Sequence, residues 1–289
     1  MTQLSQERAA VIENIRTALT EGNTFAKVEL NDPRPTKEEI KRTIVPFDNL
    51  RTSPIARMKA GIARIIAERF TEAVNRNTGI VGLENLPPLD NGAIITAMHY
   101  NPTDSTPHRI LATLAGRGRQ LHIVIQESNV FMKGTFGYLM KNCNTHPVSS
   151  DLRYMAANLR PALGQILSGG ALLLIYPEQE MWFNYKKPRP TRDGAYHWAK
   201  QFGVPIIPTF TEMRTLHGER DRDGLYPVRH TLHVLDPIFP DPALGTAEDR
   251  ARMQAADEAA KAAAYERIYG IPLTADFIPE RDIAGIEPD

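Results

Sequence analysis

The sequence has little cysteine and no excess of charge of either sign. Its 289 residues include a single cysteine, Cys143, which excludes an internal disulfide and a cysteine-based zinc site and fits a reducing compartment. We expect Cys143 to be a small buried apolar residue rather than a thioester-forming nucleophile, because nothing near it marks an activated thiol. With 34 basic and 34 acidic residues, no overall field attracts nucleic acid, which is therefore not an expected partner.

The sequence also lacks a hydrophobic segment long enough to cross a membrane. Its longest apolar run, ALLLIY at residues 171–176, is far shorter than the ~20 residues that a spanning helix needs. The first residues, MTQLSQERAAVIENI, have none of the apolar core of a signal peptide. We therefore expect a cytoplasmic protein that is soluble or touches the inner face of a membrane from one side.

Residues 1–78 read as an N-terminal helical region. Residues 5–19 are predicted to form a helix, and Thr36 with Glu39 has the spacing of a capping box. Residues 55–74 are amphipathic, with apolar residues on one face of a 3.6-residue period and more arginine and lysine than glutamate elsewhere. This basic helix is expected either to lie on an anionic membrane surface or to dock its apolar face on the neighbouring domain.

Residues 79–289 alternate strand and helix patterns, which indicates an α/β fold with a mixed, largely parallel sheet covered by helices. The expected strands are 79–83, 92–98, 121–126, 171–176 and 204–213, with 230–236 returning as a hairpin partner. The expected helices begin at Thr106 and cover 150–167, kinked near Pro161, then 193–202 and 247–269. The prolines of the strand 204–213 suit a sheet edge or a strand start.

Polar side chains follow one apolar strand at the point where the strand ends. The stretch AIITAMHYNPTDSTPHRIL, residues 93–111, runs through His99 to Asp104 and into a predicted helix. Because sites in open α/β sheets collect at the carboxyl ends of strands, His99 is well placed for catalysis. Asp104 is free of a capping role if Thr106 caps the helix. A loop bent at Pro102 would let the carboxylate orient one imidazole nitrogen and leave the other as a base.

Two other histidines have an acidic residue five positions later, so the spacing by itself is weak evidence. His122 precedes Glu127, and His146 precedes Asp151. His122 is expected inside a strand, and His146 in a loop after the polar residues KNCNT. Position at a strand end therefore selects the pair within residues 93–111.

Several motifs in order along the chain resemble the glycerophospholipid acyltransferase family. They are GIVGLENLPP, the His99-x4-Asp104 pair, GGALLLIYPEQ and RDGAYHWAKQFGVPIIPTF, and the likeness covers over half the chain, to about Pro240. The resemblance implies transfer of a fatty acyl group from coenzyme A or acyl carrier protein to a hydroxyl of a glycerolipid, lysophospholipid or glycolipid. It makes His99 the general base and Asp104 the residue that orients its ring, with no metal and no redox cofactor.

The resemblance also points to residues that bind the acceptor. Glu178 matches the glutamate of the family's Pro-Glu-Gly motif, and Gln179 stands beside it in place of the glycine. The family's arginines after this motif and near THPVSSD, residues 145–151, are missing. Since guanidinium groups suit phosphate, glycerol phosphate is expected to be a poorer acceptor than a lipid or glycolipid hydroxyl. Lys187 and Arg189 could replace the arginines; the other reading is a solvated basic loop.

Three other functions remain open at this point. A metal-dependent hydrolase could use His99, Asp104 and His108 as ligands, although no further carboxylate cluster is evident. Serine hydrolysis is disfavoured because no Gly-x-Ser-x-Gly elbow is present. A non-catalytic, lipid-binding member of the family is the third alternative, suggested by the altered motif after Glu178.

Overall fold

The computed structural model describes residues 4–30, 32–50, 53–89, 91–116 and 118–288. Three helices come first, at α1 (Gln6–Thr20), α2 (Lys37–Leu50) and α3 (Pro54–Val74). The central elements are β1 (Gly79–Val81), η1 (Leu83–Asn85), β2 (Ala93–Thr96), α4 (Thr106–Leu114), β3 (Leu121–Gln126), η2 (Glu127–Phe131), α5 (Gly134–Asn142), β4 (Thr145–Val148), α6 (Leu152–Tyr154), η3 (Met155–Leu159), α7 (Arg160–Ser168) and β5 (Leu172–Ile175). The chain closes with α8 (Gly194–Phe202), β6 (Ile206–Thr215), β7 (Val228–Val234), α9 (Thr246–Tyr269) and α10 (Pro279–Asp282).

Seven strands of the described residues form one sheet, in the order β1-β7-β6-β2-β5-β3-β4. All neighbouring pairs are parallel except β6 with β7, which form an antiparallel hairpin. The central strands β2 and β5 are buried throughout, as expected for parallel strands covered on both faces. The predicted α/β class with a mixed, largely parallel sheet is confirmed.

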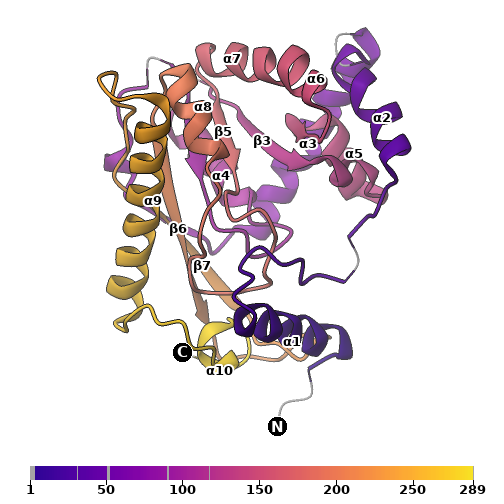
Figure 1. Cartoon of the computed structure of the whole chain (residues 1–289). Helices are drawn as coiled ribbons and strands as arrows, with labels where there is room; N and C mark the ends of the chain where they lie inside the picture. The colour runs from indigo at the N-terminus through magenta and orange to yellow at the C-terminus, as the bar shows by residue number, and fades with distance from the viewer. Residues whose placement is uncertain (1–3, 31, 51–52, 90, 117, 289) are drawn as a thin grey trace.

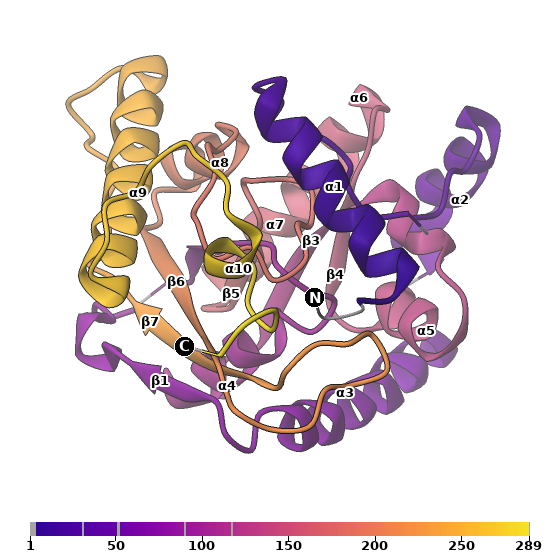
Figure 2. The ribbon, with the colours of Figure 1, turned by 90° about the horizontal axis from the view of Figure 1, so that it is seen from below.

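Helices cover the sheet on both faces, and the direction of each crossover decides which face. The chain moves from β2 towards the β4 edge through α4 and α5, and returns to β5 and then β6 through α7 and α8. Because parallel crossovers are right-handed, opposite directions place the helices on opposite faces. Figure 2 shows α3 and α4 on one side of the sheet and α7, α8 and α9 on the other. The helices after β2 and β5 therefore leave on opposite faces, and in open α/β sheets the carboxyl ends of two such neighbours mark the crevice where ligands bind.

Several predicted elements are confirmed, and two details are wrong. Of the two alternatives for the prolines of the strand 204–213, the strand start is confirmed: β6 lies in the middle of the sheet, and Pro205 and Pro208 stand at or near its beginning. His146 lies in the short edge strand β4, whose four residues and central proline leave no local alternation to recognise. Thr106 is the first helical residue rather than the cap, since its hydroxyl donates to the Thr103 carbonyl, 2.7 Å away.

The N-terminal helices pack on different parts of the molecule. Val11 and Ile15 of α1 join a hydrophobic cluster with Trp182, Tyr185 and Ile283 from the second half of the chain. Figure 1 shows α1 beside α10, next to the C-terminus. Helix α3 instead packs on α4 and α5. The division of the chain at residue 78 stays a proposal about where the catalytic unit begins.

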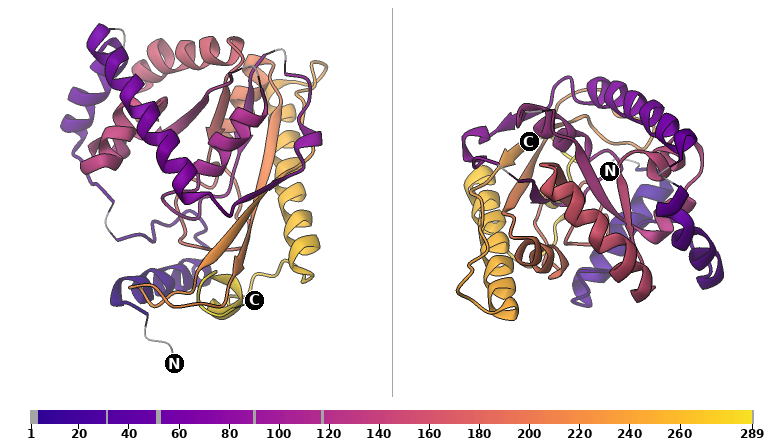
Figure 3. Two further views of the ribbon diagram at one scale, coloured as in Figure 1. Left: turned by 180° about the vertical axis from the view of Figure 1, so that it is seen from behind. Right: turned by 90° about the horizontal axis from the view of Figure 1, so that it is seen from above.

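The amphipathic helix α3 leaves most of its large apolar side chains exposed, although Phe70 is half-buried and packs edge-on against Phe136. Ala63, Ala67 and Thr71 face the protein, because small residues let α5 approach closely. Ile55, Met58 and Ile65 are each about 60% exposed, at 63%, 61% and 60%. Of the two alternatives for α3, docking on the neighbouring domain therefore holds for its small residues and Phe70, and not for the exposed part of its apolar face. Figure 3 shows α3 running along the outside of the molecule, and no helix within the described ranges is apolar and long enough to span a bilayer.

Candidate active site

The loop after β2 is folded by its asparagine. The Asn101 side-chain oxygen accepts hydrogen bonds from the backbone N–H and the hydroxyl of Thr103, both at 2.8 Å. The Asp104 N–H donates to the Asn101 carbonyl at 3.2 Å, which closes the turn around Pro102. Such asparagine turns compete well with helical backbone and are common before a helix. The turn brings Asp104 back against the end of β2, as the sequence predicted.

His99 and Asp104 form a direct hydrogen bond at this position. His99 Nδ1 lies 2.7 Å from Asp104 Oδ2, and the same oxygen accepts the N–H of Tyr100 at 3.0 Å. Since an ionised carboxylate only accepts, Nδ1 carries the proton and Nε2 presents a lone pair. Nε2 makes no hydrogen bond to any residue that the structure describes, and the His99 side chain is 23% exposed. The geometry is that of an oriented general base that a substrate can reach.

Tyr176, at the end of the neighbouring strand β5, completes the surroundings of the pair. Its hydroxyl donates to Asp104 Oδ1 at 2.6 Å, and its ring stacks on His99 with centroids 4.2 Å apart. Burial, followed by the nearby Asp104 charge, raises the pKa of Tyr176 well above its usual range, so the phenol stays protonated and donates. The sequence reasoning missed Tyr176; its place directly before Pro177-Glu178 was the available signal.

Glu178 lies directly behind His99. Its carboxylate accepts the His99 N–H at 3.3 Å and the Arg189 N–H at 2.9 Å, and pairs with the Arg189 guanidinium at 3.0 Å. Glu178 is buried, and these donors all come from the protein. This arrangement ties the end of β5 to the end of β2. It gives no support to the prediction that Glu178 contacts an acceptor directly.

The basic stretch 184–192 is not a solvated loop. Lys187 is buried and pairs with Asp282 at 3.0 Å, while it also donates to the Thr274 and Asp276 carbonyls. Arg189 is held by Glu178 and stacks over Trp182. Both cations hold the structure together, so the geometry does not support their predicted contact with an acceptor. Burial lowers the pKa of Arg189, but the guanidinium keeps its carboxylate partner.

Gln179 occupies a backbone conformation that favours glycine. Its φ is +65°, in the left-handed region, and its side chain is exposed beside the site. The predicted contact between Gln179 and the substrate stays a prediction. A side chain held at such a φ is typical of functional positions, where the surrounding structure imposes the strain.

Both ring nitrogens of His108, the third predicted metal ligand, already have hydrogen-bond partners within the protein. Its Nδ1 hydrogen-bonds the Asp104 carbonyl at 2.9 Å and its Nε2 the Thr209 hydroxyl at 3.0 Å. Burial lowers the pKa of His108 to about 4. Among the described residues, no group of three histidine, cysteine, aspartate or glutamate side chains is arranged to hold a metal.

The other histidines with the same spacing do not meet their acidic partners. His122 Nδ1 lies 2.9 Å from His146 Nε2 on the neighbouring strand. Asp151 instead caps α6 by accepting the Arg153 and Tyr154 N–H groups. Cys143 is buried against Ala63 and Ala67, as expected for an apolar residue.

A segment far away in the sequence borders the site. We call residues 23–30 and 32–36, between α1 and α2, the N-terminal strap. Its Thr24 carbonyl accepts from Arg189 at 2.9 Å, and its Ala26 carbonyl accepts the Trp182 indole N–H at 3.0 Å. Lys27 of the strap lies 3.9 Å from Glu180. No local pattern in the sequence indicated that this segment reaches the carboxyl ends of the strands.

Comparison with known proteins gives a match to one family model. The Acyltransferase family model matches residues 77–212, which contain His99, Asp104 and Glu178. No curated protein sequence matches the chain. Among solved structures, a 1-acyl-sn-glycerophosphate (LPA) acyltransferase, PlsC, from Thermotoga maritima is similar, with 15% sequence identity and a TM-score of 0.48 over 91% of this chain and 97% of that one.

Proposed function

The Acyltransferase family model matches residues 77–212, and from this match we propose that the protein acylates a hydroxyl of a glycerolipid, lysophospholipid or glycolipid. The acyl donor is a thioester of coenzyme A or acyl carrier protein, which acts as co-substrate. His99 is the general base and Asp104 holds its ring. The observation that supports this assignment most is the 2.7 Å contact from His99 Nδ1 to Asp104 Oδ2, with Nε2 directed to no protein group that the structure describes.

The proposed reaction needs only groups that lie at the crevice. Nε2 of His99 removes the proton of the acceptor hydroxyl while the oxygen attacks the thioester carbonyl carbon. The carbon–sulfur bond then breaks, and the imidazolium returns the proton to the leaving thiolate, which gives an ester and a thiol. Asp104 stabilises the imidazolium without becoming protonated. No metal or redox cofactor takes part in this scheme.

We propose further that the protein works at the inner face of a membrane, with α3 as its contact. The exposed face of α3 carries Ile55, Met58, Ile62 and Ile65, and the helix also carries Arg57, Lys59, Arg64 and Arg69. A helix with an apolar face and basic flanks binds anionic lipid surfaces. An acceptor dissolved in that surface would then lie near the enzyme.

A transfer assay tests the chemistry. Labelled acyl-coenzyme A and acyl carrier protein would each be offered with lysophospholipids, glycolipids, diacylglycerol and glycerol phosphate. His99→Ala should lower the rate by about 10² to 10⁴, the usual contribution of a general base, and leave the fold intact. His146→Ala is the matched control, because this histidine has an acidic residue at the same spacing but contacts His122 instead.

The outcomes separate the alternatives. An equal loss of transfer rate in both variants, or a loss only in His146→Ala, would contradict the assignment of His99 as the general base. Binding of lipid without turnover of any donor would favour the non-catalytic member of the family. Loss of activity on chelation, restored by added metal, would favour the metal-dependent hydrolase.

A further inference from the structure

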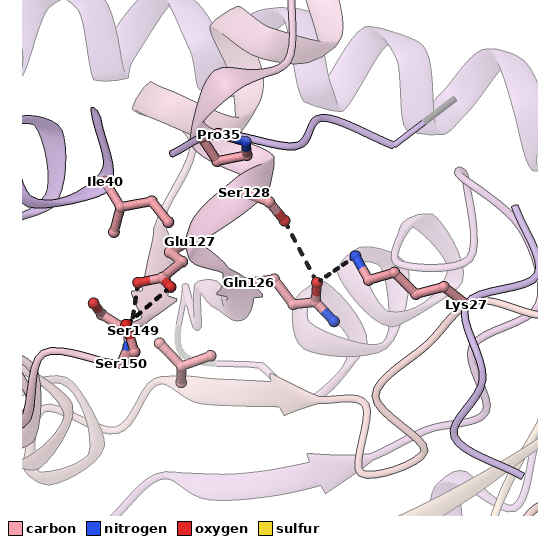
Figure 4. A pocket seen from close by; sticks show the side chains of 9 residues that line it. Lys27, Pro35, Ile40, Gln126, Glu127, Ser128, Ser149 and Ser150 are labelled. Atoms are coloured by element: carbon pink, nitrogen blue, oxygen red, sulfur yellow. Dashed lines mark hydrogen bonds between the residues drawn. The ribbon is translucent and has the colours of Figure 1, made fainter. Parts of the chain in front are cut away.

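A hollow of about 400 Å³ lies over the carboxyl ends of β3 and β4, next to the candidate active site. Its lining comes from the strap, from α2 and from the two strand ends (Figure 4): Lys27, Pro35, Ile40, Gln126, Glu127, Ser128, Val148, Ser149 and Ser150. The volume is within the usual range of ligand pockets. None of its lining residues takes part in the proposed acyl-transfer step.

The hollow is within reach of an acceptor whose hydroxyl is at His99. Strand β3 is separated from β2 by β5 alone, and neighbouring strands lie ~4.8 Å apart, so Gln126 stands roughly 10 Å from the end of β2. The Gln126 amide donates to Glu180 at 2.8 Å, two residues beyond Glu178. One small headgroup can therefore span the two places.

The polar groups of the hollow are hydroxyls, an amide and a carboxylate. Gln126 Oε1 accepts from Lys27 and from Ser128, both at 3.4 Å. Glu127 accepts from the Ser150 N–H at 3.2 Å and from its hydroxyl at 3.4 Å. Each of these side chains can accept or donate further bonds to a ligand hydroxyl. The missing family arginine was expected in this neighbourhood, and serines 149 and 150 stand there instead.

The charges around the hollow disfavour a phosphate. Lys27 is the one cation among the lining residues, and its ammonium already lies 3.7 Å from Asp32 and 3.9 Å from Glu180. The lining itself has one cation, Lys27, and one carboxylate, Glu127, so its formal charge is 0. A phosphate would meet the Glu127 carboxylate, an ammonium already shared with two other carboxylates, and no guanidinium of the lining.

A cationic headgroup is also disfavoured. Glu127 already accepts two bonds from Ser150, and Glu180 accepts from Gln126 and lies near Lys27. No aromatic ring belongs to the lining of the hollow, so a quaternary ammonium would lack the usual cation–π partner. Neutral hydroxyls suit this lining best, because they can both donate to the carboxylate and amide oxygens and accept from the serines and Lys27.

We infer that the hollow binds a neutral polyhydroxyl headgroup of the acceptor, the sugar of a glycolipid. The inference rests on the proposed function and specifies the acceptor of that same site. It also assigns part of the acceptor specificity to the strap, through Lys27 and Pro35, which precede the family domain at residues 77–212. The strap is fixed at the site by Arg189 and Trp182.

Binding without turnover tests the inference directly. The His99→Ala protein would be titrated calorimetrically with three lipids of one acyl chain, below their micelle concentrations: a glucosyl monoacylglycerol, lysophosphatidate and lysophosphatidylethanolamine. The glucosyl lipid should bind most tightly, and Gln126→Leu or Glu127→Leu should weaken it about tenfold, as expected for loss of one or two hydrogen bonds. Ser168→Ala, an exposed change near the amino ends of the strands, opposite the hollow, is the control. Tighter binding of either charged lipid would overturn the inference.

A specificity exchange provides the second arm. Glu127→Gln with Ser150→Arg brings the formal charge of the lining residues from 0 to +2 and adds a guanidinium. The ratio of lysophosphatidate to glucosyl-lipid affinity should rise at least tenfold, while Ser168→Arg should leave it unchanged. An unchanged ratio in the folded double variant, checked by its melting temperature, would show that the headgroup binds elsewhere.

The two hypotheses fail in different ways. Glucosyl-lipid binding in the hollow with no acyl transfer by the wild-type protein would contradict the proposed function alone. Acyl transfer with a headgroup preference that the hollow variants do not change would contradict this inference alone.

Discussion

At the scale of single residues, Asp104 connects the strand ends on which the candidate site is built. It accepts from His99 and the Tyr100 backbone through one oxygen and from Tyr176 through the other. Each donor fixes the carboxylate, and the carboxylate in turn fixes the imidazole tautomer. Positions that act only through Asp104 should therefore alter the chemistry without touching the substrate.

Tyr176→Phe tests this positioning role. The ring that stacks on His99 remains, but Asp104 loses one donor and keeps more negative charge for the imidazolium. We expect a rate loss of about tenfold or less, and the acid limb of the profile of rate against pH should move to higher pH. Tyr138→Phe is the matched control, since its hydroxyl binds the Lys59 carbonyl on the far side of α3. An unmoved profile would mean that Tyr176 is only a packing residue.

Asp104→Asn and Asp151→Asn form a second matched pair, because both aspartates stand five residues after a histidine. An amide at 104 can hold the ring but cannot stabilise its positive charge, so activity should fall by about 10² or more. An amide at 151 still accepts the Arg153 and Tyr154 N–H groups as a helix cap, so activity and stability should hardly change. Steady-state rates measure the activity of each variant, and melting curves measure its stability. A large loss from Asp151→Asn in folded protein would contradict the assignment.

At the scale of elements, α3 shows that helical periodicity predicts a helix but not the face it buries. Its apolar face is wide, and the protein uses the small residues Ala63, Ala67 and Thr71 for the close contact with α5. The larger side chains are left on the outside. The helix therefore has an apolar surface that the described chain does not cover.

Vesicle sedimentation tests whether this surface binds lipid. The protein should pellet with anionic vesicles and be released by high salt, because each arginine or lysine near such a surface contributes ~1 kcal/mol. Arg64→Glu with Arg69→Glu should abolish the preference for anionic over neutral vesicles, and Ile62→Ser with Ile65→Ser should weaken binding to both. Lys141→Glu, on α5, is the charge control. Equal, salt-insensitive binding to both kinds of vesicle would refute the electrostatic contribution.

Glycine positions test how closely β2 approaches the turn before β5. A Cβ at Gly92 would lie 2.0 Å from the Ala171 carbonyl oxygen, whereas a Cβ at Gly194, the first residue of α8, would meet open space. Gly92→Ala should therefore lower the free energy of unfolding by several kcal/mol, since backbone must move. Gly194→Ala should raise it by about 0.5–1 kcal/mol through the entropy of the unfolded chain. Urea denaturation measures the free energy of unfolding of both variants. An equal change in the two would contradict the close contact between Gly92 and the Ala171 carbonyl.

At the scale of the whole molecule, the two ends of the chain close around the site. The strap, α1 and the segment before α10 meet the loop 182–189 that follows Glu178. Elsewhere in the molecule, His108 is buried between Asp104 and Thr209, and His230 is half-buried against Tyr100. Loss of solvent lowers the pKa of each to about 4. Between pH 6.5 and 4, these two histidines are therefore largely protonated in the unfolded chain but largely neutral in the folded protein.

Acid should destabilise the fold for this reason. Each histidine whose pKa falls from 6.5 to about 4 reduces the free energy of unfolding by about 2 kcal/mol between pH 7 and pH 5, with the loss growing as pH falls. His230→Phe keeps the stack on Tyr100 and removes one titrating group, so its stability should fall less over that range. Urea midpoints at both pH values measure the difference. His217→Phe, at an exposed position, is the control. If it reduced the loss of stability between pH 7 and pH 5 as much as His230→Phe does, the role of His230 would be contradicted.

The sequence alone determined what depends on neighbours along the chain. The helical periods, the Thr36–Glu39 capping box, the buried strand before Pro177 and the hairpin of β6 and β7 all arise from short-range preferences. So did the choice of His99 with Asp104, because a strand end, a proline suited to a bend and a predicted helix start follow one another along the chain. The α/β class followed from the alternation of these elements, without any knowledge of their order in the sheet.

Only the tertiary structure decided what depends on partners far apart in the chain. The placement of Tyr176 on Asp104, of Lys27 beside Glu180, and of Lys187 against Asp282 all join segments more than 70 residues apart. Burial also changed what a residue does: the basic stretch 184–192 looks like a solvated or phosphate-binding loop in the sequence, but its Lys187 and Arg189 pair with the buried carboxylates of Asp282 and Glu178. The physical reason is that charge, hydrogen bonding and burial are set by whichever groups the sheet order brings together, and that order is a property of the packed chain.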